Sequence, residues 1–228
     1  MVVGISTERI AEIHPTLYHM AEFGTWDSIR KHGLLSTSAL LDLFGIAGQD
    51  RNDIESSRRK AFVQIKHPKY GTITIRDQRP MSDSKLARCL RDGLTTADWY
   101  RILNSRVFFW LTESRLVTLM GAYSDREHLV LEVNTAELLK RHLPKVMLTP
   151  MNTGTTSRMA FPRGLATFQP PHKYRFEMNK KKKGGRAKAI VELTVDHSVP
   201  DISDLTFRAT HRRFDNGEAS ISEVVYQR

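Results

Sequence analysis

Residues 17–22 are Leu-Tyr-His-Met-Ala-Glu, and residues 26–36 are Trp-Asp-Ser-Ile-Arg-Lys-His-Gly-Leu-Leu-Ser. The first segment predicts a short strand. The second predicts a helix, because Thr25 offers a capping hydroxyl before it and Gly33 a left-handed exit after it. His19 therefore leaves a strand just before a turn into a helix, where a ligand can reach it. The alternative from the residues alone is a half-buried histidine that bonds to the backbone.

Composition favours one globular domain and a phosphate-rich partner. The chain has 228 residues, of which 40% are hydrophobic, so we expect a single domain over residues 1–228. Its 35 Lys and Arg exceed its 25 Asp and Glu, which gives a net charge of +10. Such a charge attracts nucleic acid and also phosphate-rich cofactors. A basic surface that only serves solubility is the alternative.

Several classes of protein are disfavoured by what the sequence lacks. It has no apolar run of about 18 residues and no export signal, so we expect a cytoplasmic protein that does not cross a membrane. Cys89 is the only cysteine and the nine histidines are scattered, so we expect neither a disulfide nor a bound metal. Without a Gly-x-Gly-x-x-Gly or Gly-Lys-Ser/Thr motif, a dehydrogenase or a nucleoside triphosphatase is disfavoured.

The order of the predicted elements favours an α+β fold. Short strands and helices follow one another without strict alternation, which is typical of a mainly antiparallel, split sheet with flanking helices. We expect strands at 72–75, 107–111, 128–133, 146–148, 189–195 and 221–226, a helix at 113–120, and a break at 48–53. The run Lys-Lys-Lys-Lys-Gly-Gly-Arg at 180–186 predicts a mobile basic hairpin tip within a loop over 179–188.

Two further segments accompany the histidine strand. Residues 106–110 are Arg-Val-Phe-Phe-Trp and lead into Glu-Ser-Arg-Leu at 113–116. Residues 189–195 are Ala-Ile-Val-Glu-Leu-Thr-Val, followed by Val-Pro-Asp-Ile-Ser-Asp-Leu at 199–205. In short pieces across residues 17–205, the chain resembles the ADP-ribosyltransferase superfamily. The likeness is greatest to the DarT-type toxins that modify nucleic acid, and poly(ADP-ribose) polymerases are more distant.

The resemblance implies an enzyme that uses NAD as co-substrate, transfers ADP-ribose to DNA or RNA and releases nicotinamide. It also implies a toxin or phage-defence effector, with an antitoxin protein as partner. Two alternatives stay open: a non-catalytic basic nucleic-acid-binding module, and an NAD-dependent RNA 2′-phosphotransferase. The sequence does not predict the modified atom or the oligomeric state.

The resemblance also implies roles for three residues that we predict to be catalytic. Glu192 would stabilise the ribose cation, since strand alternation places it opposite the apolar Leu193. His19 would bond a ribose hydroxyl. Arg115 would hold the NAD diphosphate or orient the target, with a salt bridge to a neighbouring acid as the alternative. Glu223, on the last predicted strand, is a rival acid.

The remaining predicted site residues bind NAD or nucleic acid. The NAD-binding set is His19, Met20 through its backbone, Ser36, Phe109, Trp110 and Arg115. Core packing is the alternative role for the aromatic residues. The nucleic-acid-binding set is Lys181, Lys182, Lys183, Arg186, Arg76 and Arg79. For these cations the alternative is an ordinary solvated loop or turn.

Overall fold

The computed structural model describes residues 4–156 and 161–228, and these form two compact units. The sheet unit comprises residues 1–34, 107–151 and 169–228, and the hairpin unit comprises residues 35–106 and 152–168, each within the described ranges. The predicted single domain over residues 1–228 stays a prediction.

A large antiparallel sheet forms the sheet unit. Over the described residues it has seven strands in the order β11-β10-β6-β1-β5-β8-β7. The strands are β1 (Thr16–Glu22), β5 (Arg106–Trp110), β6 (His128–Asn134), β7 (Val146–Thr149), β8 (Glu192–Asp196), β10 (Thr206–Asp215) and β11 (Glu218–Gln227). The β11–β10, β10–β6, β6–β1, β1–β5 and β8–β7 pairs are antiparallel. The predicted α+β class with a mainly antiparallel sheet and flanking helices is confirmed.

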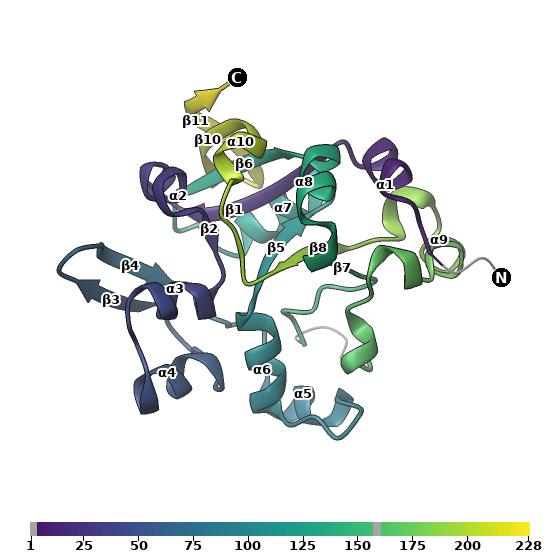
Figure 1. The fold of residues 1–228 in the computed structure, drawn as a ribbon, viewed down its shortest axis with the longest axis horizontal. Coiled ribbons are helices and arrows are strands. Elements are labelled where there is room, and N and C mark those ends of the chain that lie inside the picture. The colour runs from purple at the N-terminus through teal and green to yellow at the C-terminus, as the bar shows by residue number, and fades with distance from the viewer. Residues whose placement is uncertain (1–3, 157–160) are drawn as a thin grey trace. The chain divides into compact units, whose positions relative to one another are not determined.

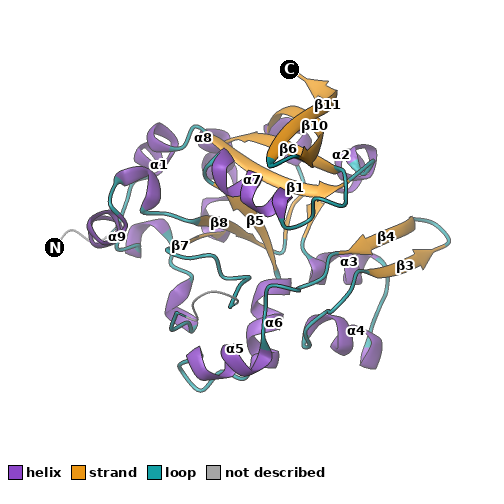
Figure 2. Ribbon diagram, turned by 180° about the vertical axis from the view of Figure 1, so that it is seen from behind, coloured by secondary structure: helices purple, strands orange, loops and turns teal. Residues whose placement is uncertain are grey.

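Helices cover both faces of this sheet (Figures 1 and 2). They are α1 (Thr7–Ile13), α2 (Trp26–His32), α7 (Glu113–Gly121), α8 (Thr135–His142), α9 (Phe176–Lys183) and α10 (Ile202–Leu205), with short 3-10 turns η1 (Leu143–Lys145), η3 (Pro171–Lys173) and η4 (Arg186–Lys188). The main core joins Trp26 of α2, Leu138 of α8 and Ile202 of α10 to Leu17 and Leu131 of the sheet. We call this side the core face. Helix α7 lies on the opposite side, the α7 face (Figure 2).

No helix within the described ranges combines the length and the apolar character that a bilayer crossing requires.

Strand β1 is paired unequally on its two sides. It meets β6 at seven register positions, from Thr16 opposite Asn134 to Glu22 opposite His128. Among the described residues it meets β5 at one position, Tyr18 opposite Trp110. His19 follows Tyr18 directly, so it lies where no register pairing joins β1 to β5.

The segment after β1 turns as the sequence predicts, with one correction. Helix α2 follows Thr25, but the Thr25 hydroxyl donates to the Glu22 carbonyl at 2.7 Å and forms no cap bond, so the predicted hydroxyl cap is wrong. Gly33 ends the helix at φ 81°, and a Cβ there would lie 2.6 Å from the Cα of Pro200. Only glycine fits this crossing. Two short strands then pair, β2 (Leu34–Leu35) and β9 (Ser198–Val199).

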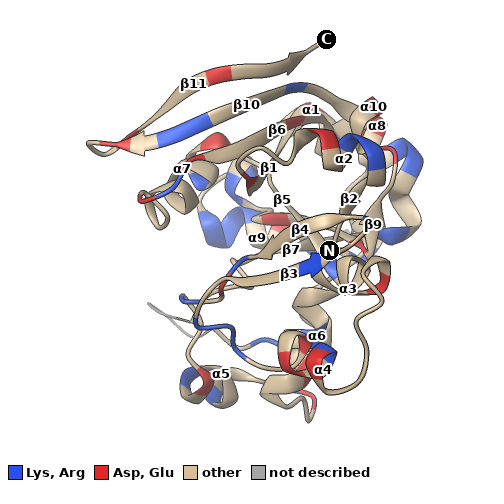
Figure 3. Ribbon diagram, turned by 90° about the vertical axis from the view of Figure 1, so that its left-hand side faces the viewer, with Lys and Arg blue, Asp and Glu red and all other residues tan. Residues whose placement is uncertain are grey.

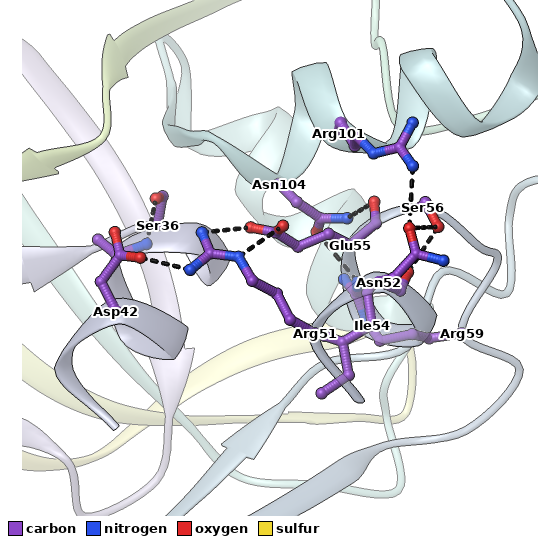
Figure 4. A network of polar contacts seen from close by, with 11 residues as sticks. Ser36, Asp42, Arg51, Asn52, Ile54, Glu55, Ser56, Arg59, Arg101 and Asn104 are labelled. Atoms are coloured by element: carbon purple, nitrogen blue, oxygen red, sulfur yellow. Dashed lines mark hydrogen bonds and ion pairs between the residues drawn. The ribbon is translucent and has the colours of Figure 1, made fainter. Parts of the chain in front are cut away.

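Polar contacts hold the hairpin unit together (Figure 4). Its elements are α3 (Thr37–Leu43), α4 (Gly48–Glu55), β3 (Val63–His67), β4 (Gly71–Ile75), α5 (Asp83–Cys89), α6 (Thr96–Asn104) and η2 (Leu165–Thr167). Arg51 of α4 pairs with Asp42 of α3 at 2.5 Å and with Glu55 at 2.9 Å. The buried Arg59 donates to the Ile54 carbonyl at 2.7 Å and to Asn104 Oδ1 at 3.0 Å. These bonds connect α3, α4 and α6.

In the hairpin unit one expectation fails and one strand was missed. The predicted break at 48–53 is helix α4, which begins at Gly48 with φ 62°. Bonds between residues four apart stabilise this polar helix, as between Gln49 and Asp53 at 2.6 Å. The strand predicted at 72–75 is confirmed as β4, but its partner β3 was not predicted.

The basic run is helical where the sequence predicted a hairpin tip. Residues 180–183 form the last turn of α9, and Gly184 caps it in the left-handed conformation at φ 74°. The cap N–H of Gly184 donates to the Lys180 carbonyl. The prediction of a hairpin tip at 180–186 is therefore wrong. Glycine at this position ends a helix, and Asn179 is buried in the preceding turn.

His14 connects the end of α1 to the end of β5. Its ring Nδ1 lies 3.0 Å from the Leu111 carbonyl, so this nitrogen donates, and the side chain is 3% exposed. Burial lowers the pKa of His14 below its ordinary value, the Leu111 carbonyl opposes this, and Arg115 adds to it. The folded protein therefore resists protonation of this imidazole.

Acid should destabilise the protein partly through His14. The unfolded imidazole takes up a proton near pH 6.5 and the folded one at lower pH, so the free energy of unfolding falls as the pH drops below about 6.5. His14→Asn keeps an N–H for Leu111 but does not titrate. Urea unfolding from pH 7 to 5 should show a steeper fall in wild type than in His14→Asn, by at most about 1.4 kcal/mol per pH unit. Parallel curves would contradict this assignment.

Candidate functional site

Glu192 is a buried acid at the start of β8. Leu193 and Val195 pack in the core, so alternation directs Glu192 to the α7 face, as the sequence predicted. Glu192 is only 3% exposed. Its register partner in β7 is Thr149, whose Oγ1 lies 3.0 Å from Glu192 Oε2. The same hydroxyl lies 2.7 Å from the Met151 carbonyl. One hydroxyl proton serves only one acceptor at a time, so Glu192 and the Met151 carbonyl compete for the Thr149 hydroxyl.

Arg115 is a half-buried cation near this acid. It is the third residue of α7, and its guanidinium forms no hydrogen bond or ion pair among the described residues, while its backbone N–H donates to the Thr112 carbonyl at 3.2 Å. Burial lowers the pKa of its guanidinium, and the carboxylate of Glu192 acts in the opposite direction. The two residues therefore share one electrostatic environment. The alternative of a salt bridge from Arg115 to a neighbouring acid is not observed within the described ranges.

Lys183 adds a second positive charge. It is the last residue of α9, is half-buried, and pairs with no acid among the residues that the structure describes. Burial lowers the pKa of its ammonium group, and repulsion from Arg115 and then Lys182 lowers it further. Two like charges that repel each other, neither of them in an ion pair with an acid of the described residues, make a candidate anion-binding site.

A buried ion pair fixes the start of α7. Arg212 of β10 is 4% exposed and lies 2.6 Å from Glu113, the first residue of α7. Its second guanidinium nitrogen lies 2.6 Å from Glu132 of β6. Since Arg115 follows Glu113 by two residues, this contact holds the α7 turn that carries Arg115 against the sheet.

His19 lies on the other face of the sheet from Glu192. Its register partner is Leu131, and opposed residues in an antiparallel pair share a face, here the core face with Leu193. The ring Nδ1 lies 2.8 Å from the Phe108 carbonyl, and the ring centroid is 5.7 Å from that of Phe109. The half-buried histidine with a backbone partner is thus observed. The structure does not bring the side chains of His19 and Glu192 together on one sugar.

The other predicted NAD contacts divide in the same way. Phe109 is 1% exposed in the core, which is the alternative role considered for it. Trp110 pairs with Tyr18, so it shares the α7 face with Glu192 and is half-buried. Met20 is buried in β1. Ser36 lies in the hairpin unit, where its hydroxyl accepts from the Ala39 N–H at 3.1 Å and caps α3.

The predicted nucleic-acid contacts are mostly solvated. Lys181, Lys182 and Arg186 are exposed in the sheet unit, and Arg186 lies 4.0 Å from Glu12. In the hairpin unit, Arg79 forms a 2.5 Å ion pair with the buried Asp77. Arg76 is half-buried at the end of β4.

The rival acid Glu223 lies far less buried than Glu192. Its side chain is 64% exposed on β11 and pairs with His211 Nδ1 at 2.9 Å. Thr149 was not among the predicted site residues, because its place opposite Glu192 depends on strand register. Lys183 was predicted, but as a target contact and not as a neighbour of Arg115.

Comparison with known proteins identifies a family whose function is unknown. A family model described as a family of unknown function, DUF7002, matches residues 15–206. This range contains Glu192, Arg115, Lys183 and His19. No curated protein matches the chain.

Inorganic pyrophosphate should bind beside Arg115 and Lys183. At about a hundred times its Kd, a ligand adds about 2.7 kcal/mol to the free energy of unfolding, which raises the Tm of a chain of this size by roughly 5–10 °C. Arg115→Met should lose this shift and Lys183→Met should weaken it. Arg30→Met removes an exposed arginine of α2 and serves as control. An equal shift in all four proteins, measured by differential scanning fluorimetry, would contradict the site.

Proposed function

The chain belongs to the DUF7002 family, a family of unknown function, and we propose that it is an NAD-dependent ADP-ribosyltransferase acting on nucleic acid. The proposed reaction breaks the bond between nicotinamide and ribose, and nicotinamide leaves with the electron pair. A nucleophilic atom of DNA or RNA then bonds to the ribose carbon and loses its proton. The products are ADP-ribosylated nucleic acid, nicotinamide and a proton.

The buried carboxylate of Glu192 is the observation that carries this proposal. Cleavage of the nicotinamide bond develops positive charge on the ribose, and a carboxylate held in a water-poor site stabilises such a charge. The same carboxylate accepts the proton of the incoming nucleophile. Its neighbour Thr149 offers a hydroxyl at 3.0 Å, which orients Glu192 Oε2.

Arg115 and Lys183 supply the charge for the diphosphate of NAD. Both are half-buried, and neither forms an ion pair with an acid of the described residues. A diphosphate between them relieves their mutual repulsion, and the guanidinium fork of Arg115 fits two phosphate oxygens. Trp110 leaves the same face of the sheet and offers a ring on which nicotinamide stacks.

The role of His19 in this proposal is to hold β1 and β5 at the place where their pairing stops. Its bond to the Phe108 carbonyl orients the ring. The backbone of Met20 follows, where no register pairing joins β1 to β5 within the described residues, so the proposal places the nicotinamide amide there. A bond from His19 to a ribose hydroxyl stays a prediction.

The net charge of +10 supports a nucleic-acid target, because Lys and Arg attract phosphates over long range. The role as a toxin or phage-defence effector with an antitoxin rests on the resemblance to DarT-type enzymes.

Transfer from NAD is tested with radiolabelled adenylate. The protein is incubated with labelled NAD and with DNA, RNA or protein, and released nicotinamide is measured in parallel. We expect label on nucleic acid and a loss of about 10²- to 10⁴-fold in Glu192→Gln, the usual range for removing a catalytic acid or base. Glu223→Gln is the matched control, since this acid is exposed, and it should retain activity.

Three results would oppose the proposal. They are the absence of label on any acceptor, unchanged turnover in Glu192→Gln, and a loss confined to Glu223→Gln. Salt-sensitive binding of nucleic acid without any effect of NAD would favour the non-catalytic module.

A further inference from the structure

The hairpin unit contains a long stretch of purely positive charge. Residues 56–76 include six Lys and Arg and no Asp or Glu. They contain the β3–β4 hairpin, which Figure 3 shows without an acidic residue on either strand. The predicted nucleic-acid contacts include only Arg76 of this stretch.

One face of this hairpin is packed and the other is solvated. Val63, Ile65 and Ile73 pack against a small core of Leu41, Ile54 and Ile75. Alternation turns the intervening residues outward, where Lys66 faces its register partner Thr72 and both are exposed. A two-stranded hairpin is marginal alone, so the apolar packing keeps it formed.

The turn of the hairpin is stiffened by aromatic contacts. His67 Nδ1 accepts from the N–H groups of Lys69 and Tyr70 at 3.1 and 3.3 Å. The His67 and Tyr70 rings stack with centroids 4.7 Å apart, and Phe44, the residue that follows α3, contacts both. The Lys69 ammonium lies 5.2 Å from the centre of the Tyr70 ring. Because the turn is already ordered, Lys69 can bind a ligand with little further loss of conformational entropy.

The cations of this stretch serve two different purposes. Arg59 is buried, and its guanidinium donates to backbone carbonyls and to Asn104, so it belongs to the fold. Lys60, Lys66 and Lys69 are exposed, and none of them pairs with an acid among the described residues. Their ammonium groups are therefore available to an anionic ligand.

We propose that the β3–β4 hairpin is a nucleic-acid contact, in which Lys60, Lys66 and Lys69 bind the phosphate backbone without reading sequence. Lysines bind phosphates as point charges, and each contact releases counterions from the nucleic acid. This inference rests on the proposed function, because the hairpin would bind the nucleic acid that the proposed reaction modifies. Binding needs no NAD, so the two proposals fail separately.

Fluorescence anisotropy with a labelled single-stranded DNA 20-mer tests this contact at several salt concentrations. For Lys66→Gln/Lys69→Gln we expect roughly tenfold weaker binding near 0.1 M salt. The slope of log K against log salt should fall by about 1.4, since each lost phosphate contact accounts for about 0.7 on a single strand. The duplex and an RNA 20-mer should lose affinity in the same variant.

The matched control is Lys31→Gln/Lys145→Gln, which removes two exposed lysines of the sheet unit and therefore the same net charge. It should bind nearly as wild type does. A second comparison, Lys181→Gln/Lys182→Gln, removes two exposed lysines of α9. Circular dichroism should give the same spectrum for all of these proteins.

Four outcomes would overturn the proposal. Wild type binds no oligonucleotide, the hairpin variant keeps its affinity and slope, the control weakens binding as much as the hairpin variant does, or the whole loss follows the α9 variant. Hairpin-dependent binding to phosphatidylserine vesicles with no change for oligonucleotides would assign the surface to membranes instead. Oligonucleotide binding without label transfer would refute the proposed reaction and leave the hairpin contact standing.

Discussion

The unequal pairing of β1 is the constraint on which the sheet unit depends. Seven register positions tie β1 to β6, whereas one position, Tyr18 opposite Trp110, ties it to β5 in the described residues. The ladder to β6 fixes which side chains enter the core, and on the β5 side His19 and Met20 have no register partner among the described residues. One strand therefore pairs fully on its β6 side and at a single position on its β5 side. Such local departures from regular structure are common at functional sites.

Two half-buried cations on the α7 side of the sheet unit, Arg115 and Lys183, lower the stability of the fold. The buried Arg212 forms ion pairs with two acids, Glu113 and Glu132. Arg115 and Lys183 form no ion pair with an acid of the described residues, although burial opposes the charge on both. A fold under selection for stability alone would remove such groups or pair them. Arg115, which interacts with both the buried Glu192 and Lys183, is the strongest reason to regard this face as a site.

Sequence reasoning predicted much of the sheet, because the segments 128–133 and 189–195 are rich in apolar, strand-forming residues. It failed at α4 and at the last turn of α9, which have no apolar stripe: charge pairs between residues four apart form the first, and Gly184 ends the second. The site was predicted only in part. Glu192 and Arg115 share an environment, but strand parity places His19 on the other face. Strand alternation and register decide which side chains lie close together, and short sequence motifs do not encode the register.

The crossing at Gly33 has a consequence for mutational scanning. A side chain at this position would overlap the backbone at Pro200, whatever its chemistry. Saturation mutagenesis of residues 17–36 would therefore report Gly33 as intolerant, as if it were catalytic, while the cause is crowding between two chain segments. Abundance and activity measured in the same cells separate the two causes, because steric failure depletes the protein itself.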